Sequence, residues 1–221
     1  MKISKLLTLL ALMIPASVIA EESDPGFYLG LGVGISQFED NIPDVDKQVD
    51  TLEAGYRLFA GYFFNDNWST ELGYADYGSD VGYYAGGEVP VKYETIGLYL
   101  NGYYHWVFLR DLPAANKLSL DLMLGVQRAE GKSQLYPPAN YPEIFQCVPG
   151  SAIEQFCQNT DKNWGLSAGL GATWQITKHI GLKAMFEATS LKFDDNTSAD
   201  GVVEEQFKIP YRFNIDAYWR F

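Results

Sequence analysis

The segment from residue 211 to residue 221 alternates between apolar side chains and side chains that are mostly charged or polar. The apolar members are Tyr211, Phe213, Ile215, Ala217, Trp219 and Phe221, and the others are Arg212, Asn214, Asp216, Tyr218 and Arg220. Because successive side chains of a β-strand point to opposite faces, the segment predicts a strand with one apolar and one charged face. Moving it by one residue would turn Arg212, Asp216 and Arg220 to the apolar side, so its register is strongly constrained.

The same alternation recurs in segments 27–36 and 117–127. The apolar sets there are Phe27, Leu29, Leu31, Val33 and Ile35, and Leu118, Leu120, Leu122, Leu124 and Val126. Five further strands are predicted at Glu53–Phe64, Trp68–Tyr77, Tyr93–Val107, Trp164–Ile176 and Ile180–Leu191. The total is eight strands, most of them long enough for the roughly 9–11 residues that a tilted strand needs to cross a bilayer.

The connections between these strands alternate in length. Those at 39–52, 78–92, 130–163 and 192–206 are long, Asn65–Asn67 and Thr177–His179 are tight turns, and 108–116 is the least regular of the short set. Long loops at one rim and short turns at the other are typical of outer-membrane barrels. A soluble sandwich or a lipocalin-like barrel would also alternate, but it has no reason to show this pattern of connections.

Aromatic residues gather next to the tight turns. Phe64, Trp68, Trp106, Trp174 and Trp219 all fall at strand ends near that rim, which predicts an aromatic girdle at one membrane interface. We therefore predict an all-β fold, an eight-stranded antiparallel up-and-down transmembrane β-barrel with long extracellular loops and short periplasmic turns.

The first twenty residues have the parts of a secretory signal: a basic start at Lys2 and Lys5, an apolar stretch over 6–14, and small residues up to Ala20. We expect a signal peptide over residues 1–20 and a barrel domain over 21–221. No later stretch approaches the roughly 18 apolar residues of a spanning helix.

Export favours a disulfide between Cys147 and Cys157, and a metal site there is disfavoured because no histidine lies nearby.

Charge and histidine content exclude further classes of function. The formal net charge of −12 disfavours nucleic-acid binding, which needs cations to neutralise phosphate. A Ser-His-acid enzyme is not expected, since His105 is placed in the lower lumen and His179 in a turn with no adjacent serine. The acidic loops lack the spacing of an EF-hand, so neither a metal nor a cofactor is predicted.

An eight-stranded barrel has an interior just wide enough to be filled by its own side chains. The inward positions are predicted to be Glu53, Arg57, Glu71, Tyr99, Asn101, His105, Asp121, Gln127, Lys183, Glu187, Arg212, Asn214, Asp216 and Arg220. Because an unpaired buried charge is costly, these acids and bases should pair and form a polar, largely closed lumen.

Three stretches carry a resemblance to a known family: GFYLGLGVG at 26–34, FAGYFFNDNWSTELGY at 59–74 and GATWQIT at 171–177, together with the closing aromatic. With them the sequence resembles the OmpA-like transmembrane β-barrel family of porin-like outer-membrane proteins. Larger members add a peptidoglycan-binding domain, which we do not expect because this sequence ends at the eighth strand.

The resemblance also implies roles for particular residues. Glu71 and Lys183 match an interior acid and base, with Arg57 and Glu187 as further candidates, and they form either a static ion pair or a gate. Trp219 and Phe221 resemble the signal that the outer-membrane assembly machinery recognises.

Two functions remain open from the sequence. The first is a structural or interaction barrel in the outer membrane of a Gram-negative bacterium, whose surface loops contact lipopolysaccharide or an unknown extracellular partner. The second is a narrow channel for ions or very small solutes. The loop 130–163, with its aromatics, prolines and cysteine pair, is the predicted contact surface, although a loop that is merely long and protease-resistant fits equally well.

Overall fold

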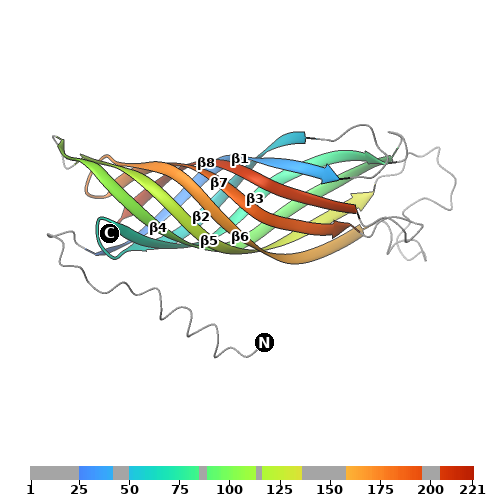
Figure 1. Cartoon of the computed structure of the whole chain (residues 1–221), viewed down its shortest axis with the longest axis horizontal. Coiled ribbons are helices and arrows are strands. Elements are labelled where there is room, and N and C mark those ends of the chain that lie inside the picture. The colour runs from blue at the N-terminus through green and yellow to red at the C-terminus, as the bar shows by residue number, and fades with distance from the viewer. Residues whose placement is uncertain (1–24, 42–49, 85–88, 113–115, 136–157, 196–204) are drawn as a thin grey trace, which may run out of the picture.

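The computed structural model describes residues 25–41, 50–84, 89–112, 116–135, 158–195 and 205–221, which form a closed antiparallel barrel (Figure 1). The strands are β1 (Gly26–Asn41), β2 (Asp50–Phe63), β3 (Trp68–Tyr84), β4 (Val89–Leu112), β5 (Asn116–Leu135), β6 (Gln158–Gln175), β7 (Ile180–Asp195) and β8 (Glu205–Arg220). The predicted fold class is confirmed. The predicted signal peptide and the cysteines Cys147 and Cys157 lie outside the described residues. Within the described ranges, no helix has the length and apolarity needed to cross a membrane.

Closure of the barrel depends on the pairing of β1 with β8, which joins Leu29 to Trp219 and Val33 to Ile215. The outward residues are apolar on all sides: Leu29 is 53% exposed, Leu122 54% and Phe213 39%. Charged side chains on the alternate positions, such as Arg212 and Asp216 on β8, are buried. The predicted orientation, with apolar side chains outside and charges inside, is confirmed.

The strands extend further toward the long connections than predicted. Strand residues occupy parts of 39–52, 78–92, 130–163 and 192–206, all predicted as loops, and of 108–116. In 78–92, for example, β3 and β4 remain paired up to Tyr84 and Val89. The prediction followed the apolar alternation and so ended each strand where that pattern ends, but backbone pairing does not need an apolar outward face.

Toward the long connections the side-chain pattern is reversed. Here many of the buried inward residues are apolar or aromatic, namely Phe38, Tyr93, Leu191, Phe193, Phe207 and Ile209, although the polar side chains of Asp80, Thr95 and Ser133 are buried at the same end. Outward positions such as Lys192 and Lys208 are polar. The register shifts in β1 after Ser36 and in β7 after Ala188 fall where the pattern changes. The interior is therefore polar in the middle, whereas the loop end combines an apolar cluster with buried polar side chains such as Asp80 and Ser133.

Two glycines give the interior room for large rings near the tight turns. A Cβ added to Gly61 would lie 2.1 Å from the ring of Tyr28, and one added to Gly181 would lie 2.1 Å from the ring of Tyr218. Both tyrosines are buried and pack against each other, with ring centroids 5.3 Å apart. Glycine in these walls lets the tyrosines fill the narrow tube.

Placing an arginine on the outward face tests the orientation of the barrel. Leu122 lies at the centre of the apolar run on β5, so Leu122→Arg should lower the free energy of unfolding by about 2–4 kcal/mol in phosphatidylcholine vesicles. Denaturant titration followed by tryptophan fluorescence measures this change. Gln134→Arg, outward on the same strand but near its loop end, is the control and should cost at most about 1 kcal/mol. Equal costs for the two variants would contradict a lipid-facing exterior.

Candidate functional site in the barrel interior

Five charged side chains form one connected network in the middle of the barrel. Lys183 Nζ lies 2.6 Å from Glu71 Oε2 and 3.6 Å from Asp216 Oδ2. Arg57 binds Asp216 with two nitrogens, Nε at 2.6 Å and Nη2, and reaches Glu187 Oε1 with Nη1 at 2.6 Å. Each of these side chains is at most 7% exposed. The fork-shaped Arg57 contact is the geometry in which an arginine binds a carboxylate most strongly.

Tyrosines complete the surroundings of the Glu71 carboxylate. Tyr99 and Tyr103 on β4 donate to Oε1 at 3.0 and 3.2 Å, and Tyr28 on β1 donates to Oε2 at 3.3 Å. The Lys183 ammonium in turn lies 4.4 Å from the centre of the Tyr103 ring. A buried carboxylate with four donors is well compensated for its lost hydration.

A third cation lies in the same part of the interior. Arg212 on β8 is 2% exposed and stacks over the ring of Tyr77 at 4.7 Å. Its Nη2 lies 3.4 Å from the carbonyl oxygens of Tyr56 and Asp76. The buried cations Arg57, Lys183 and Arg212 thus face the buried carboxylates Glu71, Glu187 and Asp216. Equal numbers of cationic and acidic side chains compensate one another in this set, which is buried away from water.

The predicted pair Glu71 and Lys183 is in direct contact, and so are the other two candidates, Arg57 and Glu187. What the sequence analysis missed is that Asp216 links both pairs into one network. Asp216 was among the predicted inward residues, but alternation gives only the face of a strand. The partners depend on the stagger of strands that are far apart in the sequence.

The remaining predicted inward residues are mostly buried as well. Gln127 accepts a hydrogen bond from Tyr77, Arg220 stacks over Phe63 at 4.9 Å, and Glu53 is only partly buried. The other buried members are Tyr99, Asn101, His105, Asp121 and Asn214.

A second polar cluster lies near the tight turns and contains a serine, a histidine and an aspartate in line. Ser69 Oγ on β3 is 2.8 Å from His105 Nε2, and His105 Nδ1 is 2.7 Å from Asp121 Oδ1. Ser119 and Thr173 also donate to Asp121, at 2.7 and 2.5 Å. The sequence analysis found no serine close to a histidine because Ser69 and His105 are far apart in the chain and meet only through strand pairing.

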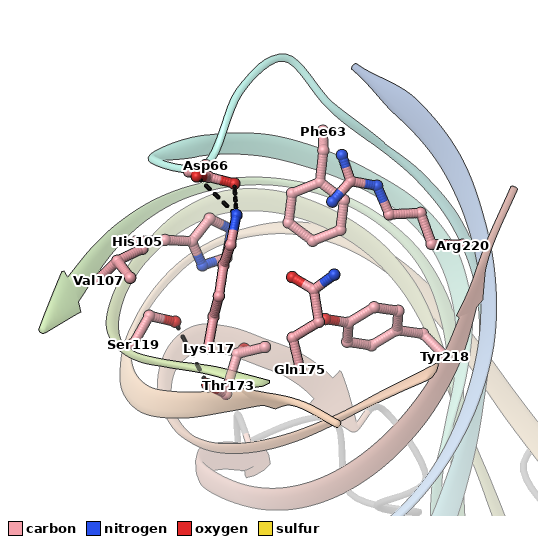
Figure 2. Close-up of a pocket in the computed structure, with 10 residues that line it drawn as sticks. All are labelled: Phe63, Asp66, His105, Val107, Lys117, Ser119, Thr173, Gln175, Tyr218 and Arg220. Carbon is pink, nitrogen blue, oxygen red and sulfur yellow. Dashed lines mark hydrogen bonds and ion pairs between the residues drawn. The ribbon is translucent and has the colours of Figure 1, made fainter. Parts of the chain in front are cut away.

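The cavity beside this cluster is small. It has a volume of about 20 Å³ and is lined by Phe63, Asp66, His105, Val107, Lys117, Ser119, Thr173, Gln175, Tyr218 and Arg220 (Figure 2). Such a volume holds about one water molecule. At its edge Lys117 Nζ contacts both carboxylate oxygens of Asp66 at 2.8 Å. Ser69 is not among the residues that line the cavity. The hydrogen bonds of the cluster connect β3, β4, β5 and β6.

The aromatic residues predicted as a girdle all point outward. Phe64, Trp68, Trp106, Trp174 and Trp219 are 41–62% exposed. They lie near the tight turns: the Phe64 amide donates to the Trp68 carbonyl, and Trp219 stacks on His179 with ring centroids 5.6 Å apart. Phe221 is also exposed, and its amide donates to the Phe27 carbonyl at 2.9 Å.

Among the described side chains, no group of three or more metal-ligating residues could hold an ion.

Several solved structures are similar to this fold. A major outer membrane protein from Thermus thermophilus is 12% identical, with a TM-score of 0.55. Neisserial surface protein A is 12% identical with a TM-score of 0.52, and Ail of Yersinia pestis, solved with the heparin analogue sucrose octasulfate, is 14% identical with a TM-score of 0.52. Each likeness covers 90% of this chain and 100% of the other. No curated protein matches the sequence.

The family assignment comes from the sequence itself. Residues 6–221 match the family described as outer membrane protein beta-barrel domain. This match agrees with the resemblance to OmpA-like barrels, with the apolar exterior and with the eight-stranded closure, and it places the protein in the outer membrane. The chain therefore belongs to the outer membrane protein β-barrel domain family.

Proposed function

We propose that this protein is a structural and interaction barrel of the outer membrane, with a closed lumen and an outer surface that contacts lipopolysaccharide or an external partner. The proposal is carried by two different groups of side chains that fill the interior one after the other along the barrel axis. The first is the charged network around Glu71, Lys183, Arg57, Glu187 and Asp216.

The second group is the apolar cluster at the loop end. Phe193 and Phe207 stack with ring centroids 4.8 Å apart, and Tyr93 lies 4.9 Å from Phe207. Leu191 and Ile209 fill the space next to them and are at most 1% exposed. An ion on the way through would lose its hydration among these side chains, which supports a lumen that does not conduct.

The outer surface remains for interaction. The structure of Ail holds a sulfated sugar analogue, and a comparable surface role here fits the long connection 136–157 with its predicted Cys147–Cys157 disulfide. The outward aromatic residues near the turns fit a girdle at the periplasmic interface. Trp219 and Phe221, both exposed on the outer wall, fit the assembly signal, and residues 1–20 fit the export signal.

A narrow channel gated by the interior ion pair is the second candidate. One observation favours it: Lys183 lies within ion-pair distance of both Glu71 and Asp216, at 2.6 and 3.6 Å. A lysine with two alternative carboxylate partners has the arrangement that a switch between two positions would need.

Conductance separates the two candidates. The purified protein in planar bilayers should show no discrete conductance steps, and Lys183→Glu should be equally silent, because the apolar cluster still closes the loop end. Lys178→Glu makes the same charge change on an exposed turn and serves as the control. Heat-modifiable gel migration shows that each variant is folded. Steps in the wild type whose amplitude changes in Lys183→Glu alone would favour the gated channel instead.

The network should also act as one unit in stability. Lys183→Met leaves the buried Glu71 side chain without its cationic partner, so the free energy of unfolding should fall by about 3–5 kcal/mol. Adding Glu71→Gln to this variant removes the unpaired charge and should recover a large part of the loss. Denaturant titrations of both single variants and the double variant in vesicles give the coupling free energy between Lys183 and Glu71. Additive losses would mean that the two residues do not act as a pair.

A further inference from the structure

The cations on the outer wall are concentrated on one side of the barrel. Six of them point outward from β4 to β8, immediately past the apolar band on the loop side: Lys92, Arg128, Lys132, Lys162, Lys192 and Lys208. We call these six residues the cationic arc. On β5, Arg128 is the next outward residue after the exposed Val126, and on β6, Lys162 follows Trp164 in the same way.

Strand pairing makes the cationic arc continuous. Arg128 is the register partner of Trp164 and lies over its ring at 5.8 Å. Asn163, next to Trp164, donates from Nδ2 to the Lys192 carbonyl at 2.7 Å, which brings β6 against β7 at this level. Lys192 is then the register partner of Lys208 on β8.

The pair Lys192 and Lys208 is unfavourable without a counter-ion. Like charges directly opposite each other on one face of an antiparallel pair destabilise it. Among the described side chains, neither lysine takes part in an ion pair. The acids on the same stretch of wall are Glu94, which pairs with Lys92 at 2.5 Å, Glu130, which pairs with Lys162 at 2.9 Å, and Glu39 on β1, which is the register partner of Lys208. The six described cations thus stand against three described acids, which leaves a surplus of positive charge around Arg128, Lys132 and Lys192.

The remaining strands of the wall, β1 to β3, provide the contrast. On β1, β2 and β3 the described outward side chains include no lysine or arginine, and the charged ones are Glu39 and Asp76. The chain as a whole is strongly acidic, with a net charge of −12. A one-sided excess of cations on such a chain, in a belt on the loop side of the apolar band, indicates an anionic ligand there.

We infer that the cationic arc binds the phosphate groups of a phosphorylated lipid of the outer leaflet, the lipid A part of lipopolysaccharide. Phosphate accepts several charge-assisted hydrogen bonds, and a phosphate between Lys192 and Lys208 would relieve their repulsion. A lipid is favoured over a soluble anion because exposed apolar residues lie further along the same strands toward the tight turns, such as Tyr211 and Phe186, and would contact its acyl chains. This inference rests on the proposed function and moves the contact from the loops to the barrel wall.

Binding of lipid A to the full chain in neutral detergent tests the assignment. Bisphosphorylated lipid A should remain bound to the wild type in native mass spectrometry and raise its Tm. Lys192→Gln/Lys208→Gln should bind at least tenfold more weakly. Without lipid A, the Tm of this double variant should equal or exceed that of the wild type, because a like-charge contact has been removed. Weaker lipid A binding combined with an unchanged or higher Tm distinguishes a binding role of the two lysines from a folding defect.

Lys178→Gln, which removes an exposed lysine at the opposite rim, is the matched control and should bind lipid A as the wild type does. Lipid A stripped of both phosphates should bind far more weakly, and inorganic phosphate should not compete at equal concentration. Unchanged binding by the double variant, full binding of the dephosphorylated lipid, or displacement by inorganic phosphate would each overturn the inference. None of these outcomes alters conductance, so the closed lumen is tested separately.

Discussion

The rest of the structure depends on one constraint, the pairing of every backbone N–H and C=O inside lipid. The pairing of β1 with β8 meets it by leaving no free strand edge. Once the sheet is closed, each strand has a lipid face and an interior face. The alternation of apolar and polar side chains follows from that geometry, and so does the narrow interior in which the charges of distant strands are brought into contact.

The narrowness of the tube explains why its charges form a network rather than separate pairs. Arg57, Lys183 and Asp216 come from β2, β7 and β8, and each meets more than one partner. In so small a cross-section a long cationic side chain reaches across to the opposite wall. The resulting contacts hold together strands that share no backbone hydrogen bonds, so the interior adds crosslinks to a wall already joined edge to edge.

Much of the fold could be predicted from the sequence, because in lipid the pattern of side chains and the position of the strand are tied together. The eight strands and their inward charges were predicted in this way, whereas the contact of Glu71 with Lys183 was implied by the family resemblance. The strand ends past the membrane were not, because there the outward face is polar and the alternation is reversed. The bridging role of Asp216 and the alignment of Ser69 with His105 depend on the stagger between strands, which no single segment encodes.

The apolar cluster around Phe193 and Phe207 gives the loop end a different source of stability from the rest of the barrel. Side chains there are buried as in a water-soluble protein, with polar residues outside, whereas the middle of the barrel is held by the bilayer around it. The two parts therefore respond to different changes in their surroundings. A change in the thickness of the bilayer acts on the middle, while a water-soluble denaturant reaches the loop end first and can loosen it while the membrane-embedded strands stay paired.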